Sequence, residues 1–148
     1  MAITSFREQF AFLSNFYPAR VVLDGTIYPT VEHAYQAAKT LVRAERDGIL
    51  DANTPGKAKL LGRKATLRPN WDTIKVTIMR NLIAQKFADP KLRKLLLITG
   101  NDRLVEGNTW GDTFWGVCNG QGQNMLGQLL MAERSKILTE RSSYGTTS

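Results

Sequence analysis

Cysteine and histidine are nearly absent from this chain. Its 148 residues include one cysteine, Cys118, and one histidine, His33. A single cysteine cannot form an intramolecular disulfide, and this scarcity is typical of proteins of the reducing cytoplasm. One histidine and one cysteine are also too few for a closed zinc site. We therefore expect a cytoplasmic protein without such a metal centre, while a Mg²⁺ ion held by carboxylates stays open.

Long apolar runs are missing as well. The stretch Leu95–Ile98 is among the longest, whereas a membrane-spanning helix needs about 20 apolar residues. The opening MAITSFREQF lacks the basic segment and apolar stretch of a secretory signal. No internal repeat, low-complexity block or linker divides the chain. The sequence thus predicts one domain over residues 1–148, away from membranes, with a flexible polar tail at 139–148.

Acidic side chains are outnumbered by basic ones. The chain has 20 Lys and Arg against 13 Asp and Glu, a formal net charge of +7 and a pI near 9.8. This balance favours anionic partners such as phosphorylated small molecules or nucleic acid. Basic residues are densest at 57–68 and again at 91–94. A solvated helical face explains either cluster as well as a nucleic-acid groove does, so charge alone does not decide between them.

Turn signals and apolar periodicity predict a helix-rich α+β domain with a small β-sheet. Asp24 and Gly25 form a strong hairpin-turn signal between arms at 21–23 and 26–28, and Thr30 is a typical N-cap. The pattern lacks the regular βαβ alternation of a dinucleotide-binding fold. Short strands joined irregularly are expected from Phe10 to Val22, a brief strand over 103–106, and helices over 31–43, 54–65, 72–88, 90–98 and 123–138.

The stretch from Trp110 to Gly127 carries residue types suited to a nucleotide-like ligand. An indole face such as that of Trp115 can stack on a flat ring, and the Asp112 carboxylate can face positive charge developing on a sugar carbon. The turn at 120–122 would let backbone N–H groups and a helix N-terminus approach a phosphate. The same residue types form cores and turns about as often, so both interpretations stay open for this stretch alone.

The helix expected at 31–43 has a polar face that its core role does not require. Glu32 on this face can hydrogen-bond a ribose hydroxyl or act as a general acid or base. Lys39 can pair with a phosphate or, if desolvated, attack a ribose aldehyde to form a Schiff base. A solvated face gives the same pattern in most surface helices, and His33 is expected to be structural. The polar face comprises Glu32, Gln36, Lys39 and Arg43, and the core face comprises Val31, Ala34, Ala38, Leu41 and Val42.

Short motifs follow one another along nearly the whole chain: FLSNFYP at 12–18, DGTIYPTVEHAYQAAK at 24–39, LLGRKA at 60–65, MRNLIAQKF at 79–87, LVEGNTWGDTFWG at 104–116 and GQGQNMLGQLLM at 120–131. In this order, and with Trp71, they resemble the YbiA-like or NADAR (NAD- and ADP-ribose-associated) proteins from about Phe10 to Ile137. The resemblance implies a compact α+β fold and hydrolysis of N-glycosidic bonds. One branch of the family acts on phosphoribosylamino-pyrimidine intermediates of riboflavin biosynthesis, and another removes ADP-ribose from guanine in nucleic acid.

The resemblance also implies roles for residues at the matching motif positions. The lysine that closes the EHAYQAAK segment, Lys39, is a candidate nucleophile or phosphate anchor. Trp110 is expected in the core instead. The implied active site contains Glu32, Trp71, Asp112 and Trp115, and the expected substrate contacts further include Asn15, Gln36, Arg63, Gly122 and Asn124.

Together these observations predict an N-glycosidase. Cleavage of a ribosyl C1′–N bond builds positive charge at C1′, which Asp112 or Glu32 can stabilise while the other activates water or protonates the leaving nitrogen. An alternative route opens the ribose and passes through a Lys39 imine. Neither route needs a metal or another cofactor. A non-catalytic module that binds ADP-ribose or nucleic acid is the alternative function, an interaction protein with a basic surface is a more distant one, and the oligomeric state stays open.

Overall fold

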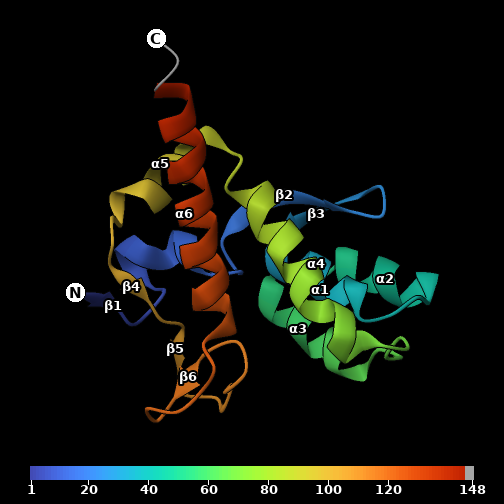
Figure 1. Ribbon diagram of the computed structural model, residues 1–148. Coiled ribbons are helices and arrows are strands. Elements are labelled where there is room, and N and C mark those ends of the chain that lie inside the picture. The colour runs from blue at the N-terminus through green and yellow to red at the C-terminus, as the bar shows by residue number, and fades with distance from the viewer. Residues whose placement is uncertain (146–148) are drawn as a thin grey trace. The chain divides into compact units, whose positions relative to one another are not determined.

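The structure, a computed structural model, describes residues 1–145, and the chain divides into two compact units (Figure 1). The central unit runs from Asn15 to Ala88, and the terminal unit combines Met1–Ser14 with the chain from Asp89 onward. Each unit has its own helices, short strands and buried apolar residues. The helix-rich α+β class predicted from the sequence is confirmed. The strands of the described residues form separate two-stranded sheets instead of one small sheet.

The central unit begins with the predicted β-hairpin. Strands β2 (Pro18–Leu23) and β3 (Thr26–Thr30) are antiparallel, and their register pairs the residues on either side of the turn. Asp24 and Gly25 form that turn with φ values of 49° and 81°. A two-residue turn of this left-handed kind matches the twist of the strands, and Asp-Gly adopts it readily. Local turn chemistry therefore accounts for the hairpin.

Helix α1 (Val31–Ala38) follows β3 directly. Thr30 Oγ1 accepts the backbone N–H of His33 at 3.0 Å, so Thr30 is the predicted N-cap. His33 Nδ1 lies 2.8 Å from the same hydroxyl, and Nε2 lies 3.0 Å from the Ala52 carbonyl oxygen. Because a carbonyl only accepts, Nε2 of the neutral ring carries the proton and the Thr30 hydroxyl donates to Nδ1. The structural role predicted for His33 is confirmed.

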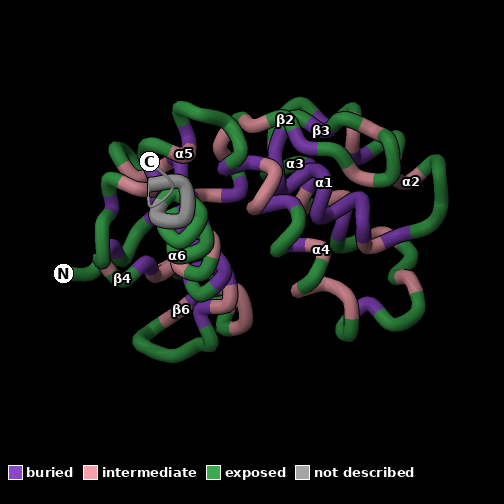
Figure 2. The backbone as a smooth tube through the Cα atoms, turned by 45° about the horizontal axis from the view of Figure 1, so that its top comes forward, coloured by how far each residue is buried: buried purple, intermediate pink, exposed green. Residues whose placement is uncertain are grey.

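Every residue of α1 is buried, as the purple tube of Figure 2 shows. The helix contacts the β2–β3 hairpin and three further helices: α2 (Arg43–Leu50), α3 (Pro55–Lys64) and α4 (Trp71–Lys86). Small side chains such as Ala34 and Ala37 let these neighbours pack closely. Of the two interpretations of the polar face, the solvated one does not hold for α1, since its polar side chains Glu32 and Gln36 are buried as well.

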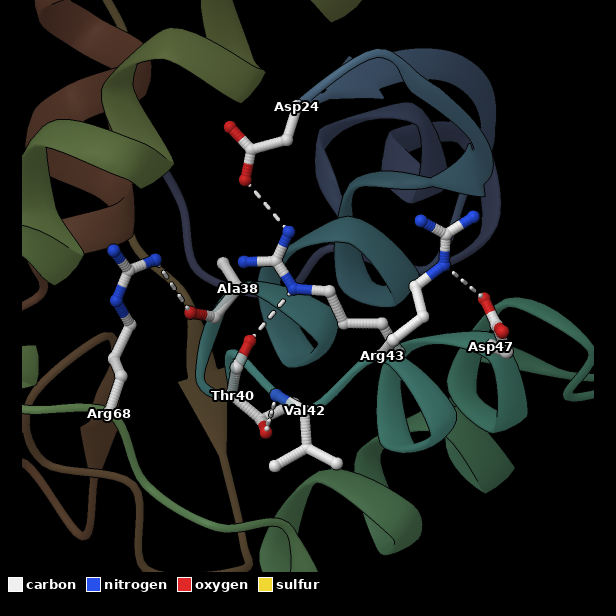
Figure 3. Close-up of polar contacts among 8 residues, drawn as sticks. Asp24, Ala38, Thr40, Val42, Arg43, Asp47 and Arg68 are labelled. Atoms are coloured by element: carbon white, nitrogen blue, oxygen red, sulfur yellow. Dashed lines mark hydrogen bonds and ion pairs between the residues drawn. The ribbon is translucent and has the colours of Figure 1, made fainter.

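The end of α1 differs from the predicted helix over 31–43. The helix ends at Ala38, whose carbonyl oxygen accepts Arg68 Nη1 at 3.4 Å (Figure 3). The Thr40 carbonyl oxygen accepts Arg46 Nε at 2.7 Å. These side chains, which come from later segments, take carbonyl oxygens that a longer helix would use for its own hydrogen bonds. A residue distant in sequence, Arg68, therefore contributes to the early end of α1.

Three residues of that predicted helix lie elsewhere than expected. Leu41 and Val42, expected in the core, are 61% and 44% exposed, because the chain leaves the helix before them. Arg43 begins α2, which the sequence did not predict, and pairs with Asp47 at 3.2 Å (Figure 3). It is therefore not part of the polar face of α1. Helix α2 buries Ile49 alone among its residues, so few apolar residues mark this helix in the sequence.

Helices α3 and α4 confirm the predicted helices at 54–65 and 72–88. Thr54 Oγ1 accepts the backbone N–H of Lys57 at 3.1 Å and caps α3, and Pro55 occupies its first turn. Helix α4 begins at Trp71, which is buried. The cap and the first-turn proline are local signals, which is why the sequence was sufficient here.

The terminal unit contains the remaining elements. The segment from Phe10, expected as strand, forms the end of a 3₁₀ helix. The strand was expected because Phe10 and Phe12 alternate as apolar residues of a strand do. Helix α5 and strand β4 confirm the predicted elements at 90–98 and 103–106, and β1, β5 and β6 were not predicted. The elements are β1 (Ala2–Ile3), η1 (Glu8–Leu13), α5 (Pro90–Ile98), β4 (Arg103–Leu104), β5 (Gly107–Asn108), β6 (Val117–Cys118) and α6 (Met125–Gly145); β1 pairs with β4 and β5 with β6, both in parallel.

Helix α6 is longer than the predicted helix over 123–138. It continues to Gly145, so most of the tail expected to be flexible at 139–148 is helical. Residues 146–148 of that tail lie outside the described residues. Across residues 1–145, no helix combines the length and the apolar character that crossing a bilayer requires.

Candidate active site

Glu32 occupies the first turn of α1, where the free backbone N–H groups of a helix favour negative charge. Its own backbone N–H donates to the Asn15 carbonyl oxygen at 3.1 Å. The side chain is 7% exposed, and its Oε1 accepts Gln36 Nε2 at 2.8 Å. Glutamate is rarely buried to this extent unless it is paired or functional. Its burial therefore makes Glu32 the strongest candidate carboxylate of the central unit.

Asn15 supports Glu32 through its backbone, whereas its side chain has another contact. The side-chain amide Nδ2 lies 3.6 Å from Met79 Sδ, and Asn15 is buried. A thioether is only a weak acceptor, so this contact costs little to exchange for a better one. The substrate contact expected from Asn15 stays a prediction.

Lys39 follows α1 directly and lies beside the aromatic ring of Tyr35. Its Nζ is 5.6 Å from the centroid of the Tyr35 ring, within the range of a cation–π contact. The Tyr35 ring in turn packs on Trp71, with centroids 5.3 Å apart and planes tilted by 53°. Both aromatic residues are buried. An amine and an aromatic pair are thus adjacent in the central unit.

The surroundings of Lys39 weaken its hold on the proton. Burial lowers the pKa of Lys39 below its ordinary value of 10.5. The negative charge of Glu32 opposes this shift, while the positive charges of Arg63, Lys59 and Lys75 add to it. A lowered pKa increases the fraction of neutral amine near neutral pH, and the neutral amine is the form that attacks carbonyl carbons.

Two of these cations, Lys59 and Lys75, were not among the predicted site residues. Lys59 lies one helical turn before Arg63 on α3, and Lys75 lies one turn after Trp71 on α4. Residues four apart share a helix face, so this spacing relative to a predicted site residue is the signal that could have found them. Arg63 itself is exposed on α3, and its predicted substrate contact stays a prediction.

Asp112, in the terminal unit, organises a loop. Its Oδ1 accepts the backbone N–H groups of Phe114 at 3.1 Å and Trp115 at 2.9 Å. The Asn108 side chain holds the Asp112 backbone: Oδ1 accepts its N–H at 3.0 Å, and Nδ2 donates to its carbonyl oxygen at 2.9 Å. Aspartate commonly stabilises turns in this way. The geometry supplies a structural role for Asp112, and its catalytic role stays a prediction.

The two tryptophans of this loop differ in their surroundings. Trp115 is half-buried, and its ring meets the Phe114 ring edge to face with centroids 4.9 Å apart. Trp110 is 51% exposed, so its expected place in the core is wrong. The reason is local: Trp110 lies on an irregular loop just before Gly111, whose φ is 86°, and not on a helix or strand face.

The expected phosphate cradle at Gly122 is not supported. The backbone N–H groups of Gln123 and Asn124 donate to the carbonyl oxygens of Thr113 at 2.8 Å and Gly116 at 3.2 Å. A Cβ on Gly122 would overlap the Gly116 carbonyl oxygen, so glycine allows two backbone segments to pack directly together. These N–H groups are therefore engaged within the unit and do not point to a ligand.

Asn124 joins the same internal network. Its side-chain Oδ1 accepts the backbone N–H of Glu106 at 2.9 Å, and its Nδ2 donates to the Leu104 carbonyl oxygen at 2.9 Å. The residue is buried. Asn124 thus links β4 and the segment after it to the start of α6, and the substrate contact expected from Asn124 stays a prediction.

The predicted site residues fall into two groups. The central unit brings together Glu32, Gln36 and Lys39, and the Tyr35 ring links Lys39 to Trp71. The terminal unit carries Asp112, Trp115, Gly122 and Asn124. Across residues 1–145, no group of three or more His, Cys, Asp or Glu side chains is placed to hold a metal ion.

A helix-rich α+β fold with a buried carboxylate and an amine of lowered pKa beside an aromatic pair is suited to an enzyme that acts on nucleotide-like substrates. Residues 4–138, which span both units, match the NADAR domain, and the chain belongs to the NADAR domain family. The resemblance predicted from the sequence motifs is thereby confirmed.

Named relatives define the class of enzyme. The chain is 38% identical over 138 residues to the N-glycosidase YbiA of Shigella flexneri serotype 5b, across 90% of this chain and 86% of that protein. It is 36% identical over 141 residues to a riboflavin biosynthesis protein of Vibrio vulnificus, across 93% of this chain but 38% of that protein. The NMR structure of the E. coli protein YbiA matches with a TM-score of 0.82 at 36% identity, over 95% of this chain and 86% of that one. The chain is an enzyme of the N-glycosidase class.

Proposed function

We propose that this enzyme hydrolyses the bond between ribose C1′ and nitrogen in a phosphorylated substrate. Two substrate classes fit: a ribosylamine nucleotide of riboflavin biosynthesis, and ADP-ribose linked to guanine in nucleic acid. The observation that carries the proposal is the buried Glu32 carboxylate in electrostatic contact with Lys39, an amine of lowered pKa. N-glycosidase relatives support the same reaction.

Glu32 is suited to the charge that develops during the reaction. As the C1′–N bond breaks, positive charge builds at C1′, and a carboxylate in a water-poor site stabilises it by several kcal/mol. The same group can take a proton from the attacking water or give one to the leaving nitrogen. In this role Glu32 is the catalytic carboxylate, and the first turn of α1 holds it.

Lys39 offers a covalent route to the same products. The neutral amine bonds to C1′, the C1′–N bond to the base breaks, and the leaving nitrogen takes up a proton. Ring opening at the ribose oxygen converts the adduct to an imine. Water then adds to the imine carbon and releases the amine and the free ribose aldehyde, so the net reaction is hydrolysis. The lowered pKa of Lys39 supports this route because it supplies the neutral amine.

Recognition of the substrate is assigned to the groups around Lys39. The Trp71 indole, packed on Tyr35, offers an aromatic surface for the base. Arg63 and Lys59 on α3 and Lys75 on α4 offer positive charge to phosphate oxygens. An incoming anion would relieve the mutual repulsion of these cations, which favours a phosphorylated substrate over a plain nucleoside.

Asp112 and Trp115 belong to the terminal unit and complete the proposal only as predicted partners. In the two-carboxylate version, Asp112 shares the acid and base work with Glu32. Its Oδ1 already accepts two backbone N–H groups, so the observed contacts favour Glu32 and Lys39 as the principal pair.

The two substrate classes have different support. The relative named as a riboflavin biosynthesis protein favours the ribosylamine nucleotide. The basic clusters at 57–68 and 91–94 favour nucleic acid, because a polynucleotide would contact charge well beyond the pocket. The deciding experiment assays both substrates side by side and identifies the products by mass spectrometry. Release of free base or amine from either one supports the proposal, and turnover of neither contradicts it.

The alternative function is a non-catalytic module that binds ADP-ribose or nucleic acid. It accounts for the net charge of +7 and the aromatic surface, but binding alone does not need a buried carboxylate beside an amine of lowered pKa. Isothermal titration with ADP-ribose, run with the turnover assay, separates the two functions. Tight binding without product would favour the module.

A further inference from the structure

The polar side chain of Gln36 lies inside the central unit, next to Glu32. Gln36 lies one helical turn after Glu32 and is 3% exposed. Its Nε2 donates to Glu32 Oε1 at 2.8 Å, and its Oε1 is buried without a hydrogen-bond partner among the described residues. The partner fixes the orientation of the amide, since only its NH₂ end can donate to a carboxylate. This geometry does not support the substrate contact expected from Gln36.

Gly62 on α3 provides the space that this side chain occupies. A Cβ on Gly62 would overlap Gln36 Oε1, lie 2.7 Å from its Cδ and lie 3.0 Å from its Cβ. Glycine is the least favourable ordinary residue inside a helix, apart from proline. Its presence within α3 is explained by the amide of Gln36, which packs directly against the Gly62 backbone.

We propose that Gly62 and Gln36 are positioning residues that together hold the Glu32 carboxylate in its working orientation. The backbone of α3 restrains the amide from one side, and the amide restrains the carboxylate from the other. Small displacements of a reacting group are costly, because catalysis depends on its alignment with the reacting atoms. The inference rests on the proposed function, in which Glu32 acts on the substrate.

A double-mutant cycle tests the positioning role of Gly62 and Gln36. Gly62→Ala pushes the amide away, and Gln36→Ala removes it, so each single variant should lower kcat by about 10- to 100-fold while KM changes by less than about threefold. In the Gln36→Ala background, Gly62→Ala should lower kcat by less than about twofold more, since the overlap with Oε1 and Cδ no longer exists. The remaining contact at 3.0 Å with Cβ requires only a small shift.

Gly56→Ala is the matched control on the same helix. A Cβ on Gly56 would meet only Thr54 Oγ1 at 3.9 Å, an ordinary contact, so this variant should keep wild-type kcat. Thermal unfolding of each variant gives the folded fraction, and kcat is expressed per folded enzyme. If Gly62→Ala does not fold, the inference is tested by Gln36→Ala alone, whose kcat must fall with KM nearly unchanged.

The outcomes distinguish a failure of the positioning role from a failure of the proposed function. Losses that multiply in the double variant, or a kcat per folded enzyme that stays at the wild-type value, would overturn the positioning role and leave the N-glycosidase proposal intact. A wild-type enzyme that turns over neither substrate would overturn the proposed function, and the positioning role with it.

Discussion

The two units surround their candidate carboxylates in different ways. Glu32 of the central unit lies on a helix, is buried and receives a side-chain amide. Asp112 of the terminal unit lies on a loop, is partly exposed, and receives two backbone N–H groups. Backbone donors fix the path of a chain, whereas a buried carboxylate next to an ionisable amine has electrostatic consequences for both groups. A carboxylate is therefore suited to the proposed catalysis in the central unit, whereas in the terminal unit it holds a loop.

The largest expected effect comes from removing each carboxylate charge in turn. Glu32→Gln should reduce kcat/KM by about 10²- to 10⁴-fold, because the group that stabilises charge and moves protons is lost. Asp112→Asn keeps an oxygen at the Oδ1 position for the two backbone N–H groups and should cost less than about tenfold. Hydrolysis of both substrate classes by the two variants measures the difference. Equal and large losses would mean that both carboxylates act on the substrate and that the contrast between the units is wrong.

Lys39 gives the next effect, through its pKa. Burial places this pKa below 10.5, so on the imine route the rate should rise with pH until the lowered pKa is reached and then level off. Lys39→Ala should lower kcat by about 100-fold. Borohydride added during turnover should trap a covalent adduct in the wild type and none in Lys39→Ala, as mass spectrometry would show. With Lys59→Ala as the control, the adduct should still form. If the wild type forms no adduct, the imine route is wrong and only the carboxylate route remains.

Local signals account for what the sequence predicted correctly. The Thr30 and Thr54 caps and the Asp24 turn depend on neighbours within a few residues, so the sequence predicted correctly where these elements begin. The predicted end of α1 was wrong, and one reason is that Arg68, which is distant along the chain, donates to the Ala38 carbonyl oxygen.

In the candidate site, too, local patterns were predicted correctly and contacts between elements were not. Periodicity placed Glu32 and Lys39 on one helix face, and the family motifs supplied Trp71. Periodicity did not predict that the face is buried, because burial comes from α3 and α4 packing on α1. The contributions of Lys59 and Lys75 depend on the same packing. These features depend on how helices pack against one another. Residue spacing within a single helix does not contain that information, so the sequence analysis missed them.

A second lysine of the central unit, Lys86, also has a lowered pKa, and this shift affects the stability of the fold. Lys86 of the central unit is buried, and its Nζ lies 5.8 Å from the centroid of the Tyr17 ring and 5.1 Å from that of Phe87. Burial lowers the pKa of Lys86 to about 7. Below pH 7 the folded protein must hold a buried charge. Between about pH 7 and 10.5 the unfolded chain binds the proton more readily, so stability rises with pH over this window.

Lys86→Met should therefore stabilise the protein, by about 2 kcal/mol at pH 6, and the gain should shrink as the pH approaches 10.5. Denaturant unfolding of the variant and the wild type at several pH values gives the difference, in which the other titrating groups cancel. Lys64→Met, at an exposed position of α3, is the control and should show no such trend. A gain that is constant with pH would mean that packing, and not the buried charge, is responsible.

The smallest effect concerns the loop role of Asp112. Asp112→Ala removes the acceptor of the Phe114 and Trp115 N–H groups and should destabilise the protein by about 1–2 kcal/mol. Asp112→Asn retains that acceptor and should cost less than about 0.5 kcal/mol. Denaturant midpoints of both variants, with Asp51→Ala as an exposed control, provide the comparison. If asparagine and alanine destabilise equally, the negative charge matters and the hydrogen bonds do not. Asp112 would then resemble Glu32 more closely than its backbone contacts indicate.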